Sequence, residues 1–262
     1  MKLYLYVDRD TWVHRLHPVV RLLGMLGLFV TAFLVQRPEW HVVPTATVTI
    51  LLWWTGGMAG VRRMRVLFAM VFLMTLLVWT LFYGPDGRPP LVEGGPFLIS
   101  RTAPWFALGM AIKLATMLGA GVLFLATTRV EEFAYALTRL GMPYKLGFTL
   151  TLAFRLVPVF LDSAGTVVQA QRCRGLDFDR GNLWQRLLRY VPVIVPVFMG
   201  ALRRADNMAM ALETRGFQSG RPRTVMQQHR FSAADGAALA ALTLLTGGYL
   251  ALWWSGVLAF GP

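Results

Sequence analysis

Five apolar blocks, each about 20 residues long, dominate this sequence of 262 residues. A helix of that length rises about 30 Å, enough to cross the hydrocarbon core of a bilayer. Hydrophobic residues make up 56% of the chain and charged residues only 15%, too few to cover so much apolar surface in water. We therefore predict an all-α polytopic membrane protein with about five transmembrane helices. The blocks cover approximately residues 19–35, 42–58, 66–83, 106–126 and 234–260.

Lysine and arginine in the loops predict the orientation, because cytoplasmic loops carry the excess of these residues. Cations gather before the first block, between the second and third blocks, and after the fourth. Because the spans alternate in direction, these three regions all lie on the same side of the cell's inner (cytoplasmic) membrane, which we expect to be its cytoplasmic face. We therefore expect a cytoplasmic N-terminus and a C-terminus on the opposite side.

The stretch between the fourth and fifth blocks has a different pattern. Residues 129–230 mix apolar and cationic residues at helical spacing, without a clean apolar run of about 20 residues. Such segments are typical of amphipathic helices at or below the cytoplasmic interface, here with kinks expected at Pro192 and Pro196. The predicted regions are an N-terminal membrane region with four transmembrane helices (1–128), a cytoplasmic region of amphipathic helices (129–230) and a C-terminal transmembrane helix (231–262).

The net charge of +13 restricts the class of partner. A basic excess can indicate nucleic acid, an anionic membrane surface or an acidic protein. Here the cations flank apolar spans and do not form one patch with exposed aromatic residues, so we expect a lipid bilayer and no nucleic acid. Cys173 is the only cysteine, which excludes an internal disulfide and a thiolate metal site.

Two short segments within residues 129–230 match each other. Both read Ala-x-x-x-Arg-Gly followed by an apolar residue, at 170–176 and at 211–217. Glycine after the last helical residue closes a helix in the left-handed conformation, and arginine there faces the negative end of the helix dipole. Two ordinary helix ends would explain either segment alone. The repetition of both alanine and arginine favours a pair of exposed guanidinium groups that bind carboxylates on a partner.

In this context the paired motifs resemble those of the transmembrane T component of energy-coupling factor (ECF) transporters. That family includes the Q subunits of cobalt and nickel uptake systems. The resemblance extends over most of the chain, through residues 6–18 before the first span, residues 127–143 after the fourth, and residues 152–158.

The resemblance implies a scaffold without a catalytic site, cofactor or metal of its own. Two cytoplasmic ABC-type ATPases would bind the coupling helices, and a separate membrane S component would capture the substrate. Because the S component holds the substrate, a vitamin, cobalt and nickel all remain open. The residues that would dock on the ATPases are Ala170, Arg174, Gly175, Ala211, Arg215 and Gly216.

Two other classes of function are weighed against this one. A membrane-embedded enzyme acting on a lipid or isoprenoid would need acidic or histidine clusters at a membrane face. A self-contained secondary carrier would show inverted repeats with interrupted helices near the midplane, whereas the repeat found here is in the region expected to be cytoplasmic. The sequence also lacks a Walker motif, so ATP hydrolysis is expected in partner subunits.

A few polar residues invite a functional reading. Lys113 is in the middle of a span, where an ionisable group is a functional candidate by default. The simpler interpretation is an ammonium group bound to backbone carbonyls within the bundle. For the other candidates we expect structural roles, namely polar groups at a membrane boundary for the histidines and local ion pairs for the acids. These candidates are His14, His17, Glu131-Glu132 and the Asp177-x-Asp179 pair.

Overall fold

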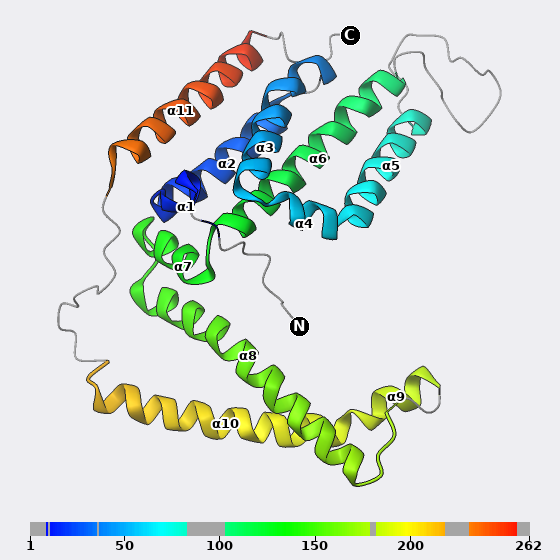
Figure 1. Cartoon of the computed structure of the whole chain (residues 1–262), viewed down its shortest axis with the longest axis vertical. Coiled ribbons are helices and arrows are strands. Elements are labelled where there is room, and N and C mark those ends of the chain that lie inside the picture. Colours follow the sequence, from blue (N-terminus) through cyan, green and yellow to red (C-terminus); the bar gives the residue numbers. More distant parts are fainter. Residues whose placement is uncertain are drawn as a thin grey trace. The chain divides into compact units, whose positions relative to one another are not determined.

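The computed structural model describes residues 9, 11–35, 37–82, 103–178, 182–217 and 231–255. Every regular element in these residues is a helix, which confirms the predicted all-α class. The chain divides into two compact units. Unit 1 contains residues 1–142 and 229–262, and unit 2 contains residues 143–228 (Figure 1).

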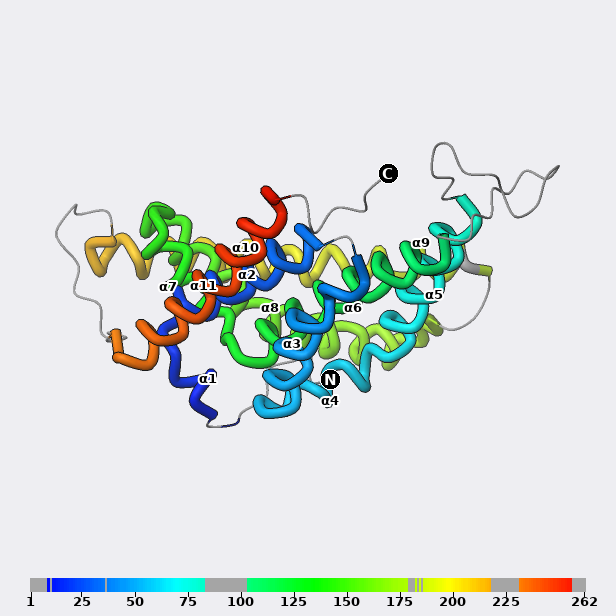
Figure 2. Tube along the Cα trace, turned by 90° about the horizontal axis from the view of Figure 1, so that it is seen from above, coloured from blue at the N-terminus to red at the C-terminus, as the bar shows by residue number. Residues whose placement is uncertain are grey.

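Unit 1 contains an apolar helix at each of the five predicted blocks. α6 packs against α2, α3 and α5, and α11 packs against α2 (Figures 1 and 2). Leucine, valine and alanine side chains from α2, α3 and α6 form the main core cluster of this unit. The five helices are α2 (Pro18–Leu34), α3 (Val42–Thr55), α5 (Arg65–Phe82), α6 (Ala103–Thr127) and α11 (Ala233–Trp254).

Four helices among the described residues are long and apolar enough to cross a membrane: α5, α6, α11 and α8 (Tyr144–Cys173). α2 is apolar but has 17 residues, and α3 has 14 residues and ends at Gly56, whose φ is 77°. α8 corrects the expectation that residues 129–230 contain no apolar helix of spanning length. It is one helix of 30 residues that continues through Pro158, and its apolar residues outweigh the scattered cations.

The described residues of unit 1 also form four short helices: α1 (Trp12–Arg15) before α2, η1 (Pro38–His41) and α4 (Met58–Arg63) between long helices, and α7 (Val130–Arg139) after α6. α7 packs against α2, so the compact unit 2 begins at Pro143, after α7.

The structure supports the simpler interpretation of Lys113, a charge bound to a backbone carbonyl within the bundle. Its ammonium group donates a hydrogen bond to the Phe33 carbonyl at 2.6 Å and lies 4.6 Å from the centroid of the Phe33 ring. A backbone carbonyl and an aromatic face therefore stabilise this cation between α6 and α2.

Unit 2 is built on α8 and α10 (Val191–Thr214), which pack against each other, with α9 (Leu183–Arg189) before α10. The chain turns at Tyr190, immediately before α10, and Pro192 lies in the first turn of that helix. Pro196 lies inside α10, which continues through it. The C-terminal ends of α8 and α10 lie at opposite ends of the unit (Figures 1 and 2).

Candidate functional site

The first Arg-Gly segment closes α8. The helix ends at Cys173, Arg174 is its C-cap, and Gly175 has a φ of 86°. The Leu176 N–H donates to the Gln171 carbonyl at 3.0 Å, and the Gly175 N–H donates to the Arg172 carbonyl at 3.0 Å. These two bonds define a Schellman closure, in which glycine supplies the left-handed residue.

The second segment closes α10 in the same way. Arg215 is the C-cap, and Gly216 has a φ of 69°. The Phe217 N–H donates to the Leu212 carbonyl at 3.0 Å, and the Gly216 N–H donates to the Glu213 carbonyl at 2.9 Å. The predicted helix ends are therefore confirmed, and the two arginines occupy equivalent positions.

A third closure, at the end of α7, is an internal comparison. Gly141 has a φ of 112°, and the Met142 N–H donates to the Leu137 carbonyl at 3.1 Å. Here the C-cap is Leu140, and Ala136 again precedes the C-cap by four residues. Helix capping therefore accounts for the glycine, and the alanine recurs in a closure that has no arginine, so the arginine is the feature that capping leaves unexplained.

Burial of the alanine separates the third closure from the other two, although Leu140 and Gly141 are themselves exposed. Ala136 is fully buried in unit 1. All six candidate docking residues of unit 2 are exposed, and neither the Arg174 nor the Arg215 side chain makes a hydrogen bond or ion pair with another described residue. The six residues are Ala170, Arg174, Gly175, Ala211, Arg215 and Gly216.

Aromatic contacts hold each closure against the start of the opposite helix. At the end of α10, the Phe217 ring centroid lies 4.7 Å from that of Phe148 in α8. After α8, the Phe178 ring lies 5.1 Å from that of Tyr190, just before α10. The antiparallel pair thus presents one cationic closure at each of its ends, with small residues beside each guanidinium group.

The other polar candidates have structural partners. The Thr11 hydroxyl and the His14 ring are 2.7 Å apart, and His17 stacks on Phe231 at 4.5 Å. Among the described residues, no group of three or more His, Cys, Asp or Glu side chains is arranged to hold a metal ion. Asp179 lies outside the described residues.

The expectation of local ion pairs is wrong for Glu132. Its partner is Arg21, 111 residues away in the sequence, at 2.9 Å. The sequence did contain a signal, since Arg21 is an arginine near the start of an apolar span, where a buried charge needs a partner. The identity of that partner depends on the packing of α2 against α7.

Comparison with known proteins gives consistent matches. Residues 9–226 match the family model CbiQ, described as cobalt transport protein. The chain is 30% identical over 261 residues to the energy-coupling factor transporter transmembrane protein EcfT of Clostridium kluyveri. This match covers 95% of this chain and 96% of that relative. The EcfT protein of Thermotoga maritima is 28% identical over 256 residues, covering 94% and 90%.

A relative with a different name is also informative. The putative ABC transporter ATP-binding protein BL0043 of Bifidobacterium longum is 30% identical over 249 residues. The match covers 92% of this chain but 32% of that relative. In that protein, a segment similar to the present chain is joined to a longer stretch of other sequence.

Proposed function

We propose a coupling role from the premise that this chain belongs to the cobalt transport protein (CbiQ) family and is the transmembrane component of an ECF transporter. It is a multi-pass membrane protein that works with an ABC-type ATPase. In our proposal, two partner ATPases bind unit 2, and their ATP-driven motion reaches a separate membrane S component. The transported substrate is a vitamin or a transition-metal ion.

Similarity to an ABC transporter ATP-binding protein supports the ATPase partnership. In the Bifidobacterium longum relative, the stretch similar to this chain makes up 32% of a protein whose name assigns it ATP binding. Joining two sequences in one polypeptide gives them a high effective concentration for each other. We propose that the present chain binds an ATPase in the same partnership, as a separate subunit.

The equivalence of Arg174 and Arg215 is the observation that carries the docking proposal. Both are C-caps of Schellman closures, and both are exposed. A guanidinium group presents a planar fork of donors that matches a carboxylate in a bidentate contact. Two equal cationic closures at opposite ends of one unit fit two equal acidic sites, one on each ATPase.

The antiparallel arrangement of α8 and α10 also constrains their orientation. If the pair crossed the membrane, Arg174 and Arg215 would face opposite compartments. Both arginines reach cytoplasmic ATPases only when the pair lies along the cytoplasmic interface. We therefore propose this position for α8 despite its spanning length, with the N-terminus of the chain in the cytoplasm.

Exposed apolar stripes on unit 2 support contact with a membrane S component. In α8 and α10 they recur at helical spacing, so that one face of each helix is apolar. An apolar surface of this kind is covered by lipid or by another subunit. The exposed residues of the stripes are Phe154, Val157, Leu161, Val191, Ile194, Val195, Phe198 and Leu202.

The docking proposal is tested by substituting both arginines. We expect Arg174→Ala with Arg215→Ala to leave the protein folded and to abolish co-purification of the ATPases in mild detergent. Truncating one side of a charged interface contact costs about 2–5 kcal/mol. Two such losses would weaken binding by several orders of magnitude, and ATP-driven uptake would be lost with it.

The matched control removes two arginines from the middle of α10. Arg203 and Arg204 are exposed and lie away from both closures, so Arg203→Ala with Arg204→Ala changes the net charge equally. This control is expected to retain the ATPases. Full ATPase retention and uptake in the Arg174/Arg215 variant would show that the closures are not the docking sites.

A further inference from the structure

The first turn of α2 collects polar contacts from three other helices. The partners of this turn follow α6 and begin α11, regions that the ATPase-docking proposal does not use. Within unit 1 these contacts join positions more than a hundred residues apart in the sequence. We call this group the α2 anchor; its members are His17, Arg21, Glu132 and Asp235.

Arg21 joins α2, α6 and α7. The residue is 7% exposed, and its Nε donates to the Leu16 carbonyl at 3.0 Å. Its Nη1 donates to Glu132 Oε2 at 2.9 Å and to the Thr127 carbonyl at the end of α6. Because a buried guanidinium group is costly without such partners, these three helix ends are held in one arrangement.

Glu132 continues this connection into α7. The same Oε2 that accepts from Arg21 also accepts the Arg129 N–H at 3.0 Å, which caps the first turn of α7. The carboxylate therefore fixes the start of α7 to the first turn of α2. Its neighbour Glu131 is exposed and makes no such contact among the described residues.

Asp235 joins α2 to α11. The residue is 1% exposed, its Oδ1 accepts the His17 N–H at 2.6 Å, and its Oδ2 accepts the Ser232 N–H at 2.8 Å. His17 and Ser232 are the N-cap residues of α2 and α11. One buried carboxylate thus serves the N-termini of two helices, and the His17–Phe231 stack lies beside it.

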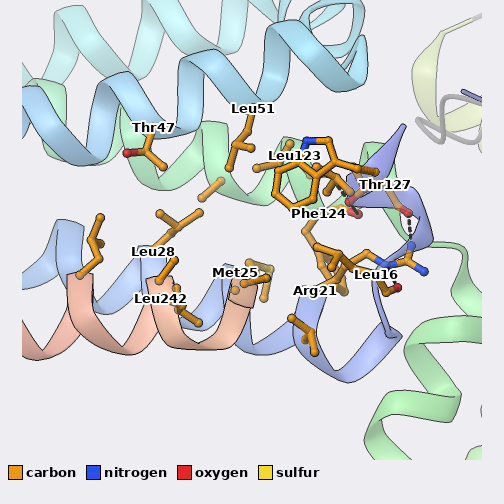
Figure 3. Close-up of a pocket in the computed structure, with 18 residues that line it drawn as sticks. Leu16, Arg21, Met25, Leu28, Thr47, Leu51, Leu123, Phe124, Thr127 and Leu242 are labelled. Carbon is orange, nitrogen blue, oxygen red and sulfur yellow. Dashed lines mark hydrogen bonds between the residues drawn. The ribbon is translucent and has the colours of Figure 1, made fainter. Parts of the chain in front are cut away.

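Packing between α2 and α11 is incomplete next to the anchor. A cavity of about 270 Å³ lies between α2, α3, α6 and α11, with Arg21 and Thr127 at one end (Figure 3). Ala238 and Ala241 of α11 line it, and a Cβ added to Gly24 would meet no atom within 4 Å. The cavity leaves the first turns of α11 with less side-chain packing against α2 than at Gly27, where Leu242 approaches closely, and Asp235 attaches this end of α11 by hydrogen bonds.

In the sequence, Glu132 and Asp235 of the anchor lie close to the two points at which the chain passes between unit 1 and unit 2. The chain passes from unit 1 to unit 2 after Met142 and returns at His229. α7 directly precedes the first passage, and Phe231 to Asp235 follow the second. Both passages are therefore tied, on the unit 1 side, to the same turn of α2.

We propose that the α2 anchor is the fixed point through which movement of unit 2 reaches the membrane helices, and that Arg21, Glu132 and Asp235 are its positioning residues. This inference rests on the proposed coupling function. A force on either passage acts on α2 through a few short polar bonds, and a rigid connection transmits it as movement of the membrane helices.

Hydrogen exchange on the purified complex with its ATPases tests this role without knowledge of the substrate. Amide exchange is compared with and without ATP and vanadate, in residues 17–24 and 231–242 and at the unit 2 closures. In the parent complex we expect nucleotide to change the exchange rate at least about fivefold in residues 17–24, in residues 231–242 and at the closures, which is the lower end of ordinary allosteric coupling.

Two substitutions, Glu132→Ala and Asp235→Ala, are expected to remove the response in residues 17–24 and 231–242 and to keep it at the closures. Glu131→Ala is the matched control and should behave as the parent. Glu132→Gln retains an amide oxygen for Arg21 and Arg129 and should restore the response. A purely structural role would raise exchange in both nucleotide states and leave their difference unchanged.

The outcomes separate the two proposals. Folded anchor variants that keep the full nucleotide response in residues 17–24 and 231–242 would overturn the anchor, as would a parent complex that responds only in unit 2. If the ATPases do not co-purify with the parent, or nucleotide leaves the closures unchanged, the coupling function fails, and the anchor fails with it. Unchanged exchange in α5 and α6 without nucleotide confirms that each variant is folded.

Discussion

Leu140, Arg174 and Arg215 occupy the same position in three similar helix closures. The surroundings of each closure determine which residue is suitable. Beside Leu140, the preceding Ala136 is buried against unit 1, whereas the alanines before the two arginines face outward. Each arginine complements the negative end of its helix dipole. In our proposal, the exposed alanine beside each arginine also leaves room for a partner to approach.

A residue outside the spanning helices gives a pH prediction. His41 ends η1, is 1% exposed, and burial together with the Lys113 ammonium group lowers the pKa of His41 from 6.5 to about 4. Because the unfolded chain binds this proton first, the contribution of His41 to folding stability is complete above pH 6.5 and decreases as the pH falls towards 4.

Thermal unfolding in detergent at a series of pH values checks this sign. The difference in midpoint between the parent and His41→Gln should be constant above neutral pH and should move in favour of the variant below it. Parallel curves over the whole range would mean that His41 titrates normally in the folded protein.

At the level of elements, the sequence predicted helices better than their partners. The five apolar blocks correspond to α2, α3, α5, α6 and α11, because block length and turn residues are local properties. The continuation of α8 through Pro158 was not predicted, because a proline inside a helical pattern ordinarily ends or kinks the helix. The Arg21–Glu132 and His17–Asp235 contacts were also missed, because their partners are distant in the sequence and pair only after the helices pack.

Glycines in α6 give a prediction for helix packing. A Cβ at Gly119 would lie 3.0 Å from Val48 Cγ1 of α3, whereas a Cβ at Gly121 would meet no atom within 4 Å. Gly119→Val should therefore force α3 and α6 apart and destabilise the protein by about 1–3 kcal/mol. Gly121→Val introduces the same side chain in the same helix without that contact. The two are compared by the midpoint of thermal unfolding in detergent, and equal midpoints would contradict the close approach of α3 and α6.

For the whole molecule, the arrangement of unit 2 determines which compartment each arginine reaches. α8 has the length and composition of a spanning helix, yet it packs antiparallel to α10, with closures at opposite ends. Two cytoplasmic docking sites are compatible with this arrangement only when the pair lies along the membrane. The coupling function therefore requires α8 to lie along the membrane, even though its apolar length would allow it to cross.

The single cysteine provides a direct measurement of this topology. Cys173 is exposed and immediately precedes Arg174. In vesicles that contain the chain, we expect a membrane-impermeant maleimide to label Cys173 from the cytoplasmic side only, because an interfacial α8 keeps both of its ends in that compartment. The control carries Cys173→Ser with Ser255→Cys, at the exposed end of α11. With the N-terminus in the cytoplasm, this control should be labelled from the opposite side. Labelling of Cys173 from that opposite side would show that α8 crosses the bilayer, and Arg174 would then be separated from the cytoplasmic ATPases.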